Sequence, residues 1–145
     1  MPHGNNNLDL SLSLDIEPKT VNQRSYVTAM RDERKSLIFC LGVAGTGKTV
    51  LAVTEALRWL AGKERGPRAR GPKPWRIILT RPPDNDRTKS IEELCEPMIY
   101  ALEKHYHPNG PGSWRSLLRS GQLELCTMEE MRARGRNIDN AFVVW

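Results

Sequence analysis

Eight consecutive residues, 42–49, constrain the fold of this chain more than any other feature of its sequence. They are Gly42, Val43, Ala44, Gly45, Thr46, Gly47, Lys48 and Thr49, a full match to the phosphate-binding P-loop pattern. The apolar residues 37–41 before the loop predict a buried strand, and residues 50–60 after it predict a helix. A strand, a glycine-rich turn and a helix in this order are the context of a working P-loop, so we predict a nucleotide triphosphate site.

The residue types of the loop suit the binding of a triphosphate. Its three glycines allow positive φ angles and a close approach of backbone to phosphate. Backbone N–H groups then converge on the anion, together with the positive end of the helix that begins near Lys48. Lys48, the candidate catalytic residue, would place a charge on the β- and γ-phosphates, and the Thr49 hydroxyl would ligate Mg²⁺. A turn that only caps a helix is the alternative, but such a turn requires neither Lys48 nor Thr49.

Length and composition indicate one globular domain. The chain has 145 residues, of which 39% are hydrophobic, and this is enough for a substantial core. No apolar run reaches the length of a membrane span, and the polar N-terminal residues lack the regions of a signal peptide. Cys40, Cys95 and Cys126 show no metal-ligand spacing, and His105 and His107 have no third ligand nearby. We therefore expect a cytoplasmic protein with reduced core thiols, no metal site at the histidines and no membrane partner.

The formal net charge of +5 permits a polyanionic partner without establishing one. Basic residues are concentrated in residues 62–76, a stretch rich in glycine and proline. We favour a solvated loop there, and the alternative is a loop that contacts the backbone of a nucleic acid beside the nucleotide site.

Strand and helix patterns alternate along the rest of the chain. Residues 8–16 alternate leucine or isoleucine with polar residues, which predicts a half-buried strand at the sheet edge or one lent to a neighbouring subunit. Further strands are predicted at residues 75–80, 122–126 and 141–145. Helices are predicted at residues 20–31, at 91–102 with a break near Pro97, at 114–119, and after Thr127, which has capping-box spacing to Glu130. This order predicts an α/β fold with a mainly parallel, doubly wound sheet.

The last predicted strand raises a question about the metal site. A P-loop ATPase uses a second carboxylate element, at the end of a neighbouring apolar strand, to hold Mg²⁺. Residues 141–145 are the obvious strand, and the sequence ends at Trp145, where that acid should follow. We therefore expect a domain that is incomplete at its C-terminus.

Four blocks of residues together resemble the PhoH-like ATPases, a family related to superfamily-one helicases. They are the entry motif at 19–23, the P-loop at 42–49, the second strand with its arginine-proline exit at 76–82, and the arginine-glycine-arginine approach to the last strand at 134–144. The resemblance divides the chain into an N-terminal strand or tail, 1–18, and a partial P-loop NTPase domain, 19–145. The sequence departs from the family at residues 83–89, which are shorter and different, and in lacking the family's Asp-Glu-Ala-Gln element (the Walker B acids).

The resemblance implies a three-layer P-loop NTPase fold that binds ATP with Mg²⁺. It also implies hydrolysis, in the complete protein, coupled to remodelling of RNA or single-stranded nucleic acid, and assembly into a homo-oligomeric ring. Gln23 would read the adenine edge, because an amide can donate and accept at once; the alternative is an exposed helix residue. Arg81, Arg134 and Arg136 would contact nucleic acid or the nucleotide of a neighbouring subunit, with surface ion pairing as the alternative.

Three functions remain open from the sequence. The first is an ATP-binding domain of an ATPase that remodels nucleic acid. The second is a non-catalytic nucleotide- or nucleic-acid-binding module that lacks the second carboxylate element. The third is a small-molecule kinase, which the helicase-like blocks around Gln23 and Arg134 disfavour. Whether the chain itself is an enzyme is left open.

Overall fold

The computed structural model describes residues 16–61, 76–82, 88–105, 113–133 and 141–145. Helices and strands alternate along these residues. The elements are α1 Val21–Arg31, α2 Lys48–Ala61, β1 Arg76–Arg81, α3 Ile91–Leu94, α4 Glu96–Glu103, α5 Trp114–Arg119, β2 Leu123–Thr127, α6 Met128–Ala133 and β3 Ala141–Val144. The predicted α/β class is therefore confirmed.

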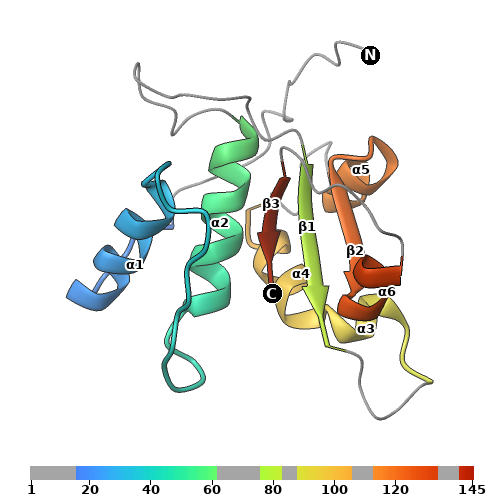
Figure 1. Ribbon diagram of the computed structural model, residues 1–145, viewed down its shortest axis with the longest axis horizontal. Helices are drawn as coiled ribbons and strands as arrows, with labels where there is room; N and C mark the ends of the chain where they lie inside the picture. Colours follow the sequence, from blue (N-terminus) through green and yellow to red (C-terminus); the bar gives the residue numbers. More distant parts are fainter. Residues whose placement is uncertain (1–15, 62–75, 83–87, 106–112, 134–140) are drawn as a thin grey trace.

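The three strands of the described residues form a parallel sheet in the order β2-β1-β3. Strand β1 is central: Ile77 lies opposite Leu123 of β2 on one side and opposite Phe142 of β3 on the other. All three strands run in the same direction in Figure 1, and the glycine-rich loop at the start of α2 lies at the end where they finish. The predicted parallel sheet and its three later strands are confirmed, in an arrangement consistent with a P-loop NTPase-like fold.

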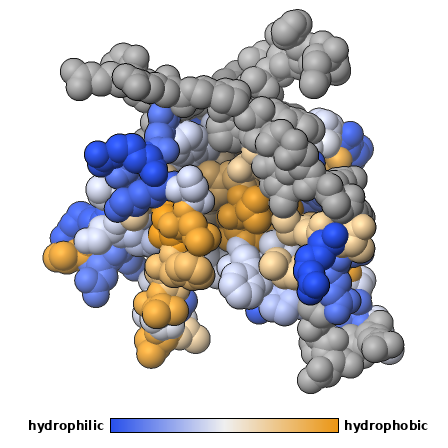
Figure 2. Space-filling model, in the orientation of Figure 1, coloured by the Kyte–Doolittle hydropathy of each residue, from blue (hydrophilic) through white to orange (hydrophobic). Residues whose placement is uncertain are grey.

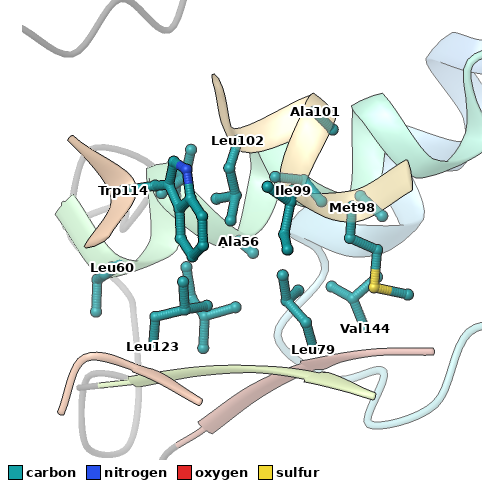
Figure 3. Packing of buried hydrophobic residues seen from close by; sticks show 14 of the residues in the cluster. Ala56, Leu60, Leu79, Met98, Ile99, Ala101, Leu102, Trp114, Leu123 and Val144 are labelled. Atoms are coloured by element: carbon teal, nitrogen blue, oxygen red, sulfur yellow. The ribbon is translucent and has the colours of Figure 1, made fainter. Parts of the chain in front are cut away.

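The hydrophobic core lies between one face of the sheet and the helices that cover it. Figure 3 shows Leu79, Leu123 and Val144 of the three strands pointing toward side chains of α2 and α4, including Ala56 and Met98. Alternate residues of a strand face opposite sides of a sheet, so every second strand residue reaches this core. Helix α2 begins at the P-loop, and most of it is buried. The core therefore forms around this helix.

Helix α1 packs on α2 through apolar and charged contacts. Val27 and Met30 belong to the same hydrophobic core. Glu55 of α2 is only 2% exposed, and Arg31 donates to both of its carboxylate oxygens at 2.9 and 3.0 Å. A buried carboxylate requires such a partner, because desolvation penalises an unpaired charge heavily. The pair therefore anchors the C-terminal end of α1 on α2.

Side-chain caps define where several helices begin. Thr20 and Gln23 form a reciprocal capping box at the start of α1, and Ser90 and Glu93 form one at the start of α3. Thr127 and Glu130 make the two corresponding bonds, at 2.9 and 3.1 Å, as predicted from their spacing. The predicted break near Pro97 also occurs: α3 ends at Leu94, and α4 begins at Glu96 with the proline in its first turn.

The strand predicted at residues 37–41 is wrong. The segment has no strand assignment, and every second side chain along it is exposed. These are Leu37 at 73%, Phe39 at 74%, Leu41 at 94% and, just beyond, Val43 at 75%. A strand requires a hydrogen-bonded neighbour, and the sheet of the described residues ends at β3 on one side and β2 on the other. Figure 2 shows apolar surface gathered over this segment and the sheet beside it.

Several sequence predictions fall on residues outside the described ranges. The strand at residues 8–16 does so except for Ile16, and the basic loop at 62–76 does so except for Arg76. Within the described residues, no helix is both long enough and apolar enough to cross a membrane.

Candidate functional site

The P-loop connects residues 37–41, called the exposed segment below, to α2. The conformation of the loop depends on two of its own glycines. Gly45 has φ of +80° and Gly47 has φ of +85°, values that residues with a Cβ rarely adopt. Positive φ was expected at Gly42 as well, but the structure does not have it there. The tight turning of the loop therefore lies at 45–47, immediately before the first residue of α2.

Lys48, the first residue of α2, turns its side chain back onto the loop. Its Nζ donates to the carbonyl oxygens of Gly42 at 2.7 Å and Val43 at 2.6 Å, and to Oγ1 of Thr46 at 3.3 Å. Thr46 Oγ1 in turn donates to the Val43 carbonyl oxygen at 2.8 Å. All three ammonium protons are thus used within the loop, and an anion bound there would compete with these carbonyl oxygens for the lysine.

Gln23 joins α1 to the P-loop. Its Nε2 donates to the Thr46 carbonyl oxygen at 3.0 Å, and the same atom lies 3.4 Å from where a Cβ on Gly47 would be. Its Oε1 accepts from the backbone nitrogens of Lys19 at 2.7 Å and Thr20 at 3.2 Å. The structure therefore brings the predicted adenine-reading residue next to the loop, but with its amide already bonded on both sides.

A pocket of about 310 Å³ lies between α1, the exposed segment and the P-loop. Its lining combines polar groups at the loop and at the start of α1 with an apolar wall. The lining residues are Thr20, Asn22, Gln23, Tyr26, Cys40, Leu41, Gly42, Thr46, Lys48 and Leu51. A concave site of this size, with few polar groups converging on an apolar wall, is typical of small-molecule binding.

Tyr26 and Cys40 give one wall of the pocket its chemical character. Burial, with a smaller contribution from the neighbouring Cys40, raises the pKa of Tyr26 to about 12. The phenol is therefore neutral at physiological pH and offers a ring face and a hydroxyl. All three cysteines were expected to be core thiols. Cys95 and Cys126 are buried as expected, but for Cys40 the expectation is wrong, because this free cysteine is only half-buried.

Among the described residues, no carboxylate lines this pocket. Thr49, the predicted Mg²⁺ ligand, is the second residue of α2 and is half-buried. The described residues contain no group of three or more histidine, cysteine or acidic side chains that could hold a metal ion. A divalent cation at the P-loop would therefore depend on Thr49, on phosphate oxygens and on water.

The predicted arginine contacts are only partly described. Arg81 is the last residue of β1, at the carboxyl end of the sheet, and it is half-buried. It does not line the pocket. Arg134 and Arg136 lie outside the described residues. The structure therefore brings Gln23 together with the P-loop and leaves Arg81 at a separate position.

Sequence reasoning missed Asn22, Tyr26 and Cys40 as pocket residues. A signal for Tyr26 was present, because it lies three residues after Gln23 on the same helix and therefore on a similar face. The capping-box spacing of Thr20 and Gln23 was a second signal, since it already assigns a hydrogen-bonding role to the glutamine. Cys40 could not be found this way, because its pattern predicted a core strand.

His105 also differs from its predicted loop surroundings. It is 1% exposed, and its Nε2 lies 2.8 Å from Oγ1 of Thr54 on α2. The Thr54 hydroxyl donates its single proton to the Val50 carbonyl oxygen at 2.7 Å, so the histidine is the donor in this pair. His105 therefore fixes the chain after α4 against α2, while His107 lies outside the described residues.

The chain is similar to known proteins over most of its length. The family model described as PhoH-like protein matches residues 15–145. A PhoH-like protein of Mycobacterium leprae is 32% identical over 139 residues, covering 89% of this chain and 35% of the relative. PhoH-like proteins of Bacillus subtilis, 32% identical, and Synechocystis, 30% identical, match over the same share of this chain and over 39% and 38% of their own lengths. The chain thus spans little more than a third of these relatives.

Proposed function

The chain belongs to the PhoH-like protein family, and from this premise we propose that it is an ATP-binding P-loop domain. The observation that carries the proposal is the position of Lys48. Its ammonium group lies at the start of a 14-residue helix, inside a glycine-rich loop and on the wall of a pocket. A cation and a helix N-terminus lie together there, and this combination favours a bound polyphosphate.

The residues present fit Mg²⁺·ATP. The positive φ angles of Gly45 and Gly47 give the loop the conformation in which backbone N–H groups can gather around an anion. Lys48 would exchange its loop carbonyl oxygens for phosphate oxygens, and Thr49 would hold the metal. The metal would neutralise phosphate charge, which is its general role in phosphoryl transfer. The apolar wall around Tyr26 and Leu51 would exclude water from the nucleoside.

We further propose that, in the complete protein, ATP hydrolysis is coupled to remodelling of RNA or another single-stranded nucleic acid. The net charge of +5 supports a polyanionic partner, and Arg81 stands at the carboxyl end of the central strand, where α/β folds place ligand contacts. A cytoplasmic location and a homo-oligomeric ring belong to the same proposal.

Calorimetric titration with Mg²⁺·ATP tests the nucleotide part of the proposal. The unmodified chain should bind, and Lys48→Ala should weaken binding by at least about tenfold, because a charge-assisted hydrogen bond contributes about 1.5–3 kcal/mol. Lys35→Ala is the matched control, since it removes the same charge from an exposed residue outside the pocket. Equal affinities for all three proteins would refute the P-loop as the nucleotide site.

A second candidate function is favoured by the lining of the pocket. Among the described residues, those that line the pocket include no carboxylate, and so none of them offers a second metal anchor or a carboxylate to orient water. A nucleotide-binding module without hydrolysis is therefore the alternative. A phosphate-release assay separates the two: binding without turnover supports the module, and turnover that Lys48→Ala abolishes supports the ATPase.

A further inference from the structure

The amide of Gln23 has little capacity left for a ligand. An amide oxygen has two lone pairs, and Oε1 already accepts from the backbone nitrogens of Lys19 and Thr20. One of the two Nε2 protons is donated to the Thr46 carbonyl oxygen. Gln23 can therefore offer a base one donor and no acceptor, which is not the donor–acceptor pair that the Watson–Crick or Hoogsteen edge of adenine requires.

Releasing Gln23 for base recognition would disturb two structures at once. The capping box at the start of α1 would lose the bonds to Oε1. The P-loop would lose its tie to α1 through Thr46. Gln23 is better suited to a positioning role, in which it holds the loop in register with the wall of the pocket.

Asn22, the preceding residue, carries the same chemical group without these engagements. It lines the same pocket as Lys48, and its side chain is exposed. In the part of the chain that the structure describes, its amide makes no hydrogen bond. It is the second residue of α1, and adjacent helix residues point about 100° apart, so the two amides face different directions.

We propose that Asn22 is the base-reading, specificity-determining residue of the site and that Gln23 is a positioning residue for the P-loop. This inference rests on the proposed function, because phosphates held at Lys48 leave the base for the α1 end of the pocket. There the Asn22 amide accepts from the 6-amino group of adenine and donates to the neighbouring ring nitrogen N7, on the Hoogsteen edge of the base. Guanine presents a carbonyl oxygen at that position, and the same amide pairs with it less well.

The test compares the binding of Mg²⁺·ATP, Mg²⁺·GTP and inorganic tripolyphosphate, each by calorimetry. The unmodified chain should prefer ATP to GTP by about tenfold, the discrimination of one bidentate amide–base pair. Asn22→Ala should bring the two nucleotides to nearly equal affinity and leave tripolyphosphate binding unchanged. Asn22→Asp, whose carboxylate still accepts from the 6-amino group of adenine but repels the carbonyl oxygen of guanine, should bind both nucleotides more weakly and retain the preference for ATP. Thr28→Ala, at an exposed residue of α1 outside the pocket, is the neutral control.

Gln23 variants test the positioning role. Gln23→Glu retains acceptors for the capping box and loses the donor to Thr46. It should therefore weaken the binding of all three ligands by a common factor and leave the ratio of ATP affinity to GTP affinity unchanged. A ratio that survives Asn22→Ala, or one that Gln23→Glu abolishes with tripolyphosphate binding intact, would overturn the inference. Binding of all three ligands by the unmodified chain without preference would also overturn it while leaving the proposed function in place. If the unmodified chain binds none of them, the proposed function itself fails.

Discussion

Tyr26 carries a pH dependence that follows from its place in the pocket wall. Burial raises its pKa to about 12, from 10.0 for an ordinary tyrosine. The folded state therefore keeps the phenol protonated at a pH at which the unfolded chain ionises. Its contribution to stability is full below pH 10 and is lost as the pH rises toward 12. We expect the free energy of unfolding in urea to fall across this range.

Tyr26→Phe is the variant that isolates this effect. The variant cannot ionise in either state, so its stability should fall less steeply between pH 10 and pH 12 than that of the unmodified chain. Tyr100→Phe is the matched control, because Tyr100 is 59% exposed and its variant should retain the steep fall. Parallel curves for the unmodified chain and Tyr26→Phe would show that another group governs the alkaline transition.

The three cysteines should differ in their reaction with a thiol reagent. Burial raises the pKa of Cys95 to about 11, and both Cys95 and Cys126 are buried. At pH 8 the Cys95 thiolate fraction should be lower than that of an ordinary cysteine by roughly two orders of magnitude. Cys40, half-buried in the pocket wall, should therefore be labelled first in the folded chain, with the other two reacting only in denaturant.

Nucleotide should protect Cys40 from labelling if the pocket is the nucleotide site. Peptide mapping after partial labelling identifies the reacting residue, and Cys40→Ser should abolish the fast phase. Labelling of Cys40 that Mg²⁺·ATP does not slow, in a chain that binds Mg²⁺·ATP, would place the nucleotide elsewhere.

At the level of single elements, the sequence was most informative where a helix start is decided locally. The Thr127–Glu130 spacing predicted a capping box because both partners lie within one turn, and the structure has both bonds. Pro97 predicted the break between α3 and α4 for a similar reason, since a proline removes a backbone donor at its own position. These are interactions between residues three or four apart, which a sequence displays directly.

The strand predicted at residues 37–41 failed because strand formation is not local. An apolar run indicates that a segment can be buried, but only a neighbouring strand makes it part of a sheet. Residues 76–81 pair with two such neighbours, β2 and β3, whereas residues 37–41 pair with no strand of the described residues. Alternation of exposed Leu37 and Phe39 with half-buried Ile38 and Cys40 is what remains of the strand pattern.

This difference predicts that a leucine-to-alanine substitution lowers the free energy of unfolding by different amounts in the two segments. Leu37 is 73% exposed and Leu57 of α2 is fully buried. Leu57→Ala should lower the free energy of unfolding by about 2–5 kcal/mol, because it leaves a cavity in the core. Leu37→Ala should change it by less than about 0.5 kcal/mol. Urea unfolding followed by circular dichroism measures both.

The paired substitutions also decide between the two descriptions of the segment. The same isopropyl group is removed in each case, so the chemistry is matched and only the surroundings differ. A cost for Leu37→Ala comparable with that for Leu57→Ala would mean that residues 37–41 are buried after all, as the sequence pattern predicted.

For the whole molecule, the sequence identified the P-loop end of the pocket and missed the other end. The P-loop is contiguous, so its eight residues identify it without reference to the fold. The pocket wall combines Asn22 and Tyr26 of α1 with Cys40 and Leu51, and no spacing rule relates residues that meet only because α1 packs on α2. The Arg31–Glu55 pair that fixes this packing is likewise invisible as a pattern, because its partners lie 24 positions apart.

The proposed nucleic-acid contact can be tested through its dependence on salt. A basic protein that binds single-stranded RNA through phosphate contacts releases counterions, so the logarithm of the binding constant falls linearly with the logarithm of salt concentration. Each phosphate contact contributes about 0.7 to the slope for single strands. If Arg81 makes one contact, Arg81→Ala should reduce the slope by about that amount, as measured by fluorescence anisotropy with a labelled oligonucleotide.

Arg115→Ala is the control for this measurement, because it removes the same charge from the molecule as a whole. Arg115 donates to both carboxylate oxygens of Glu92, at 3.2 and 3.3 Å, so its charge is already neutralised locally. The slope should therefore be unchanged in this variant. If both variants reduce the slope equally, binding reflects only the net charge of the molecule. If neither changes it, Arg81 does not contact RNA, and its position at the carboxyl end of β1 serves another purpose.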